Sequence, residues 1–210
     1  KVKKENNIYF KKYLAAEIDF LKNNKIIQNK YFKMKISAKK IIEINFTGKK
    51  KTLLSPKYKY ENKKIFFYRN PEDQYSRKLL NKFLDKYTIY SNCKFLVKEF
   101  PKIKFLKINL EKISQFTFIL SKPGLGSIKD SLKIGVPLLL TNVNYNREYL
   151  HNSRVIKKNN LGIVCDEKKI DQQIKNLSFK KYKNLINSQN KIKFSGEKKI
   201  PILIKLWKKK

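Results

Sequence analysis

Cysteine, histidine and acidic residues are scarce in this 210-residue sequence, and each scarcity excludes a kind of site. The two cysteines, Cys93 and Cys165, lie far apart and form no Cys-x-x-Cys motif, so we expect neither a disulfide framework nor a zinc site. Free thiols are typical of a reducing compartment, which favours a cytoplasmic location. The one histidine, His151, offers little material for a metal site or for acid–base chemistry.

Long hydrophobic runs and an N-terminal targeting segment are also missing. No apolar run approaches the roughly 20 residues that a membrane-spanning helix needs. The sequence starts at Lys1 rather than at Met and has no signal-peptide pattern. We therefore expect no membrane span, and the missing initiator Met leaves open whether the chain is a fragment.

Negative charge is the largest deficit, because 51 Lys and Arg residues face only 16 Asp and Glu, a net charge of +35. Such a charge favours nucleic acid, an anionic membrane surface or a phosphorylated substrate as partner. The alternative is codon bias, since the chain is rich in Lys, Asn, Ile and Tyr and uses Lys far more than Arg. The basic residues are spread along the chain rather than gathered, so we expect no nucleic-acid partner. Peripheral contact with an anionic membrane stays open.

The central motif is a strand, a glycine turn, a helix and a second strand. Residues 116–120 read FTFIL and residues 136–140 read VPLLL, which predicts two buried strands. Between them, SKPGLGS precedes a helix over about 128–134, for which Ser127 is the expected N-cap and Gly135 the end. Gly124 and Gly126 are expected to allow positive φ and close approach of a ligand. The helix N–H groups then predict a phosphate or diphosphate site.

This turn is weak as a motif on its own. It has neither the third glycine of the dinucleotide fingerprint nor the Gly-Lys-Ser/Thr of a P-loop. A polar loop follows, and then a helix on which Glu148 and Asn152 lie one turn apart on the same face. LGIV at residues 161–164 predicts a turn and a short strand.

Taken together, SKPGLGS, GVPLLL, NREYLHNSRVI and LGIV resemble the C-terminal domain of GT-B glycosyltransferases, in particular the family-28 group. The resemblance covers about residues 63–205. It implies an α/β, Rossmann-like parallel sheet with helices on both faces. It also implies a UDP-sugar donor and metal-independent displacement at the anomeric carbon, with no cofactor.

The resemblance also implies where the donor is held. Asp130 would bind the ribose hydroxyls, and Tyr149 stands where relatives carry Gln, which puts the contact with the donor sugar in doubt. His151 is not expected to be the catalytic base, which in this family comes from the N-terminal domain, so the base is unknown. The donor-binding residues implied are Ser121, Lys122, Gly124, Leu125, Gly126, Ser127, Asp130, Asn146, Arg147, Glu148, Tyr149 and Asn152.

Alternating patterns outline the rest of the chain. Residues 1–60 are expected to be a remnant of an N-terminal domain with its linker, including a helix over 9–23, a strand over 40–46 and a break at Ser55-Pro56. Residues 61–210 are expected to form the nucleotide-sugar-binding domain. Its strands are predicted near residues 64–68, 88–90, 103–108, 118–120, 137–140 and 162–164, and its helices near residues 75–85, 110–116, 170–177, 181–187 and 200–207.

These observations predict a glycosyltransferase that transfers a hexosyl or N-acetylhexosaminyl group to an unknown acceptor. The domain would be inactive without a missing N-terminal half or a partner that supplies it. Two alternatives stay open: a basic, non-catalytic protein that binds anionic lipid or nucleic acid, and a degenerate glycosyltransferase homologue.

Overall fold

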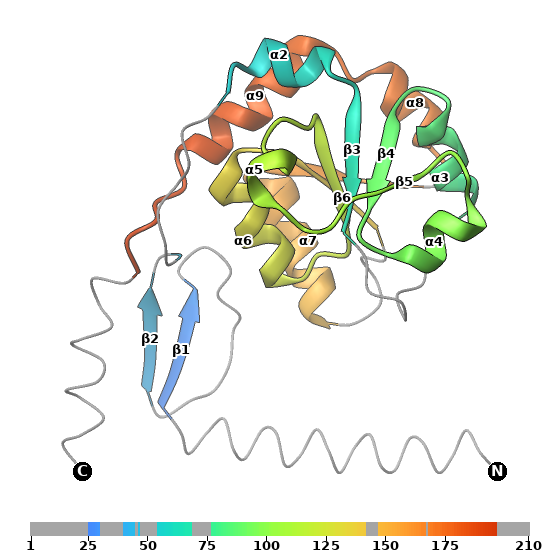
Figure 1. Ribbon diagram of the computed structural model, residues 1–210. Coiled ribbons are helices and arrows are strands. Elements are labelled where there is room, and N and C mark those ends of the chain that lie inside the picture. The colour runs from blue at the N-terminus through green and yellow to red at the C-terminus, as the bar shows by residue number, and fades with distance from the viewer. Residues whose placement is uncertain are drawn as a thin grey trace. The chain divides into compact units, whose positions relative to one another are not determined.

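The computed structural model describes residues 25–29, 40–44, 46, 54–68, 77–141, 147–166 and 168–196 (Figure 1). The chain divides into two compact units, one of residues 1–47 with 195–210 and one of residues 48–194. Within the described residues, no helix is both long and apolar enough to cross a membrane.

The smaller unit contains one pair of parallel strands. β1 (Lys25–Asn29) pairs with β2 (Lys40–Ile44), and the N–H of Gly196 donates to the carbonyl oxygen of Phe46 at 3.0 Å. β2 confirms the strand expected there, whereas β1 has no counterpart in the sequence prediction. The helices expected over residues 9–23 and 200–207 lie outside the described residues.

The larger unit is built on a six-stranded sheet in which every described pairing is parallel. Along the sheet the strand order is β5-β4-β3-β6-β7-β8. The strands are β3 (Lys64–Phe67), β4 (Thr88–Ser91), β5 (Lys104–Phe105), β6 (Phe118–Ser121), β7 (Leu138–Leu140) and β8 (Gly162–Val164). The predicted fold class is therefore confirmed.

Both faces of this sheet are covered, so its central strands are buried along their length. β6 and β7 are buried at every position, as expected for parallel strands between two layers of helices. On one face, apolar side chains of α3, α4 and α9 pack in one cluster with Ile65 and Phe67 of β3. α5, α6 and α7 lie on the other face (Figure 1). The helices of this unit are α2 (Pro56–Glu61), α3 (Arg77–Leu84), α4 (Lys94–Glu99), α5 (Leu110–Ile113), α6 (Leu125–Ile134), α7 (Arg147–Lys158), α8 (Ile170–Lys175) and α9 (Phe179–Asn190).

Helix α2 corrects the break predicted at Ser55-Pro56. Proline is tolerated in the first turn of a helix, where its missing N–H has no partner to lose, so the helix begins at Pro56 instead of ending there. Lys59 fastens α2 to the sheet unit: its side chain is 1% exposed, and Nζ donates to the carbonyl oxygens of Ile134 at 3.0 Å and Gly135 at 2.9 Å. The division between the units falls at residues 47 and 48, so α2 belongs with the sheet. A remnant of an N-terminal domain in the first part of the chain stays a prediction.

Candidate functional site

The strand order reverses beside β3. The chain builds outward from β3 through β4 to β5 and then returns to place β6 on the other side of β3. Open parallel sheets of this kind bind ligands beyond the carboxyl ends of the strands at such a reversal. Here those ends are Tyr68, whose N–H donates to Leu120 O at 2.9 Å, and Ser121 at the end of β6.

The turn after β6 leads directly into α6. The helix begins at Leu125 with Gly124 as N-cap, and no described side chain caps its first N–H groups. Gly124 has a φ of −78°, and Gly135 at the other end of α6 is the one described glycine with a positive φ. The expectation of positive φ at Gly124 and Gly126 is therefore wrong.

Gly124 and Gly126 instead leave open space at the start of α6. A Cβ built at Gly124 or at Gly126 would meet no heavy atom within 4 Å. Leu125 and Gly126 are exposed. Neighbouring residues therefore leave room around both glycine positions at the start of α6.

Ser127 is not the N-cap that the sequence suggested, because the helix starts three residues earlier than predicted. From the first turn, Ser127 Oγ lies 3.1 Å from Lys122 O and 3.0 Å from Gly124 O, so its hydroxyl can donate back to the turn. Ser121 Oγ lies 2.9 Å from Lys122 O and 3.2 Å from Ser127 Oγ. These buried hydroxyl groups stabilise the turn through hydrogen bonds to its backbone and to each other.

Asn152 joins this turn to α7. The residue is 2% exposed, and its Nδ2 donates to Pro123 O at 2.8 Å and lies 3.3 Å from Glu148 Oε1. Lys122 Nζ lies 5.8 Å from the centre of the Tyr149 ring. Asn152 is therefore a positioning residue that connects the turn after β6 to α7, the two segments that the sequence predicts to bind the donor.

The charge of Asp130 acts on Tyr68, a residue that sequence reasoning missed. Burial raises the pKa of the Asp130 carboxyl, and the charges of Lys129 and Lys133 oppose this effect. Burial also raises the pKa of Tyr68, and the negative charge of Asp130 adds to the rise. Tyr68 follows β3 directly, so its position at a strand's carboxyl end was the signal that could have identified it.

Of the other residues implied by the resemblance, Arg147 and Glu148 lie exposed at the start of α7, and Asn146 lies outside the described residues. Nε2 of His151 is buried without a hydrogen-bond partner in the described structure. The described part of the chain contains no group of three His, Cys, Asp or Glu side chains that could hold a metal ion. Whether Asp130 and Glu148 face one ligand stays a prediction.

Neither a protein-family model nor a curated protein sequence matches this chain. Solved structures do. Arabidopsis thaliana UGT89C1 in complex with quercetin has a TM-score of 0.58 and 11% identity, over 90% of this chain and 59% of that one. MurG of Acinetobacter baumannii has a TM-score of 0.53 and 13% identity, over 80% of this chain and 60% of that one. The glycosyltransferase VinC in complex with dTDP has a TM-score of 0.53 and 10% identity, over 88% of this chain and 52% of that one.

These likenesses establish the fold. The chain has the fold found in GT-B glycosyltransferases, and it spans between 52% and 60% of the length of these three structures.

Proposed function

We propose that residues 48–194 form the donor-binding domain of a GT-B glycosyltransferase of the family-28 type, with a UDP-sugar as donor. The observation that carries this proposal is the start of α6. Its first N–H groups lie at the reversal of strand order, no described side chain caps them, and both glycine positions face open space. Such a helix start attracts a diphosphate through its N–H groups and its dipole.

The chemistry of sugar transfer suits this arrangement. Breaking the bond between the anomeric carbon and the diphosphate oxygen builds negative charge on the leaving diphosphate. The N–H groups of Leu125, Gly126 and Ser127 would donate to its oxygens and stabilise that charge without a metal. Lys122, beside the turn, would add positive charge.

The acidic residues would hold the sugar part of the donor. Asp130 lies on the same helix as the diphosphate site, and its carboxylate would accept hydrogen bonds from the ribose hydroxyls. Glu148 is held by Asn152, which also holds the turn, so the diphosphate site and α7 are coupled through one amide group. Arg147, Tyr149 and the loop residue Asn146 would complete the donor contacts.

Related folds support a nucleotide-linked donor. VinC was solved with dTDP, and UGT89C1 was also solved with UDP-L-rhamnose, at a TM-score of 0.50 and 16% identity to this chain. The described residues identify no catalytic base. We therefore propose that transfer requires a second GT-B half, from this polypeptide or from a partner. An acceptor at an anionic membrane surface would suit the +35 charge.

Calorimetric titration with UDP and UDP-sugars tests the proposal. Gly126→Val would place a branched side chain in front of the helix N–H groups, and the surrounding space is open, so the domain should fold and lose donor binding. Gly126→Ala is the graded control, since a single methyl group should weaken binding less. Asp130→Ala should weaken binding by about 1–3 kcal/mol, the scale of hydrogen bonds to a charged group. Equal affinity of wild type and Gly126→Val for UDP would refute the diphosphate site, and a folded wild type that binds no UDP would refute the donor site in this domain.

A further inference from the structure

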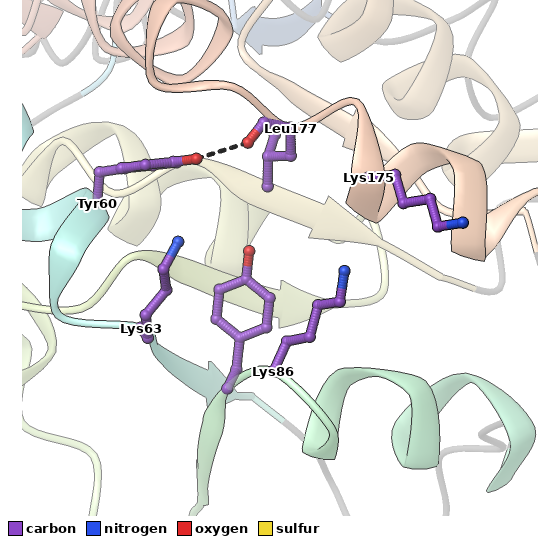
Figure 2. A pocket seen from close by; sticks show the side chains of 6 residues that line it. Tyr60, Lys63, Lys86, Lys175 and Leu177 are labelled. Carbon is purple, nitrogen blue, oxygen red and sulfur yellow. Dashed lines mark hydrogen bonds between the residues drawn. The ribbon is translucent and has the colours of Figure 1, made fainter.

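A pocket lies at the edge of the sheet opposite the candidate donor turn. Lys63 directly precedes β3, and Lys86 and Tyr87 directly precede β4, so these residues mark the amino ends of parallel strands. The candidate donor turn follows the carboxyl end of β6, at the other edge. The pocket has a volume of about 460 Å³ and is lined by Tyr60, Lys63, Lys86, Tyr87, Lys175 and Leu177 (Figure 2).

The described residues that line this pocket carry positive charge, and none of them is acidic. Three of its six residues are lysines. Lys63 and Lys86 reach toward the space in front of the hydrogen bond between Tyr60 and Leu177, and Lys175 lies at the rim on α8 (Figure 2). Burial and the charge of Lys86 lower the pKa of Lys63. Like charges gathered in this way repel one another, and an anion between them would relieve that repulsion.

Lys63 is held in an unusual backbone conformation. Its φ is 50°, in the left-handed region that lysine rarely adopts. Its carbonyl oxygen accepts from the N–H of Thr88 at 3.0 Å, which fixes the residue between β3 and β4. Its ammonium nitrogen lies 4.1 Å from the centre of the Tyr60 ring. Strained residues are frequent where a ligand is bound, so the conformation agrees with a binding role.

Tyr60 and Tyr87 give the pocket a fixed aromatic wall and a hydroxyl group that can donate a hydrogen bond. Tyr60 donates its hydroxyl to Leu177 O at 2.7 Å, which fixes the ring. Burial raises the pKa of Tyr87 to about 12, and Tyr60 adds to the rise. A tyrosine hydroxyl is protonated at neutral pH in any case, so that of Tyr87 can donate. The volume falls in the range of small-molecule sites and exceeds what a single small ion fills.

We propose that this pocket binds a small soluble molecule that carries two or more linked phosphate groups, at a site separate from the donor site. Lysine ammonium groups are effective phosphate binders, and three of them match the charge of a diphosphate better than that of a single carboxylate. The apolar faces of Tyr60, Tyr87 and Leu177 leave room for an organic part beside the phosphates. The proposal does not depend on the glycosyltransferase function.

The test uses inorganic pyrophosphate as probe and the full chain in a Gly126→Val background, so that binding at the start of α6 is blocked. Lys86→Gln with Lys175→Gln changes two exposed lysines of the pocket, and both should leave the fold intact. We expect pyrophosphate affinity to fall at least tenfold, which corresponds to about 1.4 kcal/mol. The matched control is Lys157→Gln with Lys158→Gln, two exposed lysines at the end of α7, which removes the same charge and should have little effect.

Acetylation of lysines, read by mass spectrometry with and without pyrophosphate, provides a local measurement. Pyrophosphate should protect Lys63, Lys86 and Lys175 and leave Lys157 unprotected. Equal loss of affinity in the pocket variant and the control variant would show general attraction to a basic protein and overturn the proposal. Unchanged affinity in the pocket variant, or protection spread evenly over all lysines, would also overturn it.

Discussion

Buried Lys59 makes a distinct contribution to stability at alkaline pH. Burial lowers its pKa from 10.5 to about 8. Below pH 8 the side chain is charged in both the folded and the unfolded chain, and folding carries the full cost of burying the charge. Between about pH 8 and 10.5 the folded chain has released this proton while the unfolded chain still binds it, so stability rises with pH. The fall from 10.5 to about 8 corresponds to an increase of about 3 kcal/mol in the free energy of unfolding.

Urea denaturation followed by circular dichroism from pH 7 to pH 11 can measure this increase. Other lysines, tyrosines and cysteines titrate in the same range, so the quantity to follow is the difference between wild type and Lys59→Met. That difference should change by up to about 3 kcal/mol in favour of wild type between pH 8 and 10.5. Lys57→Met on the same helix is the control, because Lys57 is exposed, its Nζ lies 4.0 Å from Glu61, and its replacement removes one lysine without touching the buried ammonium group. A difference for Lys59→Met that is constant with pH would refute the burial of a titrating ammonium group beneath α2.

Two further predictions concern β8 and the residue after it. Gly162→Ala should lower the free energy of unfolding of the larger unit by about 1–3 kcal/mol in urea denaturation, because the new Cβ would lie 2.6 Å from Leu138 O. Gly126→Ala is the control, because its new Cβ would lie in open space and should not destabilise the unit. Equal effects of the two substitutions would contradict the close packing of β8 on β7. Burial raises the pKa of the Cys165 thiol from 9.0 to about 12, so at about pH 8.5 the thiolate population, and with it the rate of alkylation by iodoacetamide, should be on the order of a thousandfold lower in the folded chain than in urea. Equal rates would show an accessible thiolate in the folded state.

The buried strands were the most predictable part of the fold. Five strands lie within a residue or two of their predicted positions: β3, β4, β6, β7 and β8. Strands that are covered on both faces consist of short apolar runs, which are easy to recognise in the sequence. The end of α6 at Gly135 was predicted for a similarly local reason, since a left-handed residue at that position favours glycine.

The remaining features depend on contacts between distant segments. α2 was missed because a Ser-Pro pair marks a helix start as well as a break. Ser127 was misassigned because its hydroxyl bonds backward to the turn rather than forward to the helix. The position of Tyr68 beside the α6 turn and the grouping of the pocket lysines depend on the strand order, which brings together residues far apart in the sequence.

The pairing of α2 with α9 has a mechanical consequence. These are the first and last described helices of the larger unit, and they pack side by side through the Tyr60 ring, which lies 5.6 Å from Phe179 and 5.4 Å from Tyr182 between ring centres (Figure 1). Tension applied to the two ends of the unit would therefore act on this helix pair before it reached the sheet. Separation of the two helices would expose the buried ring of Tyr182 to water, so we expect the two ends of the unit to open together.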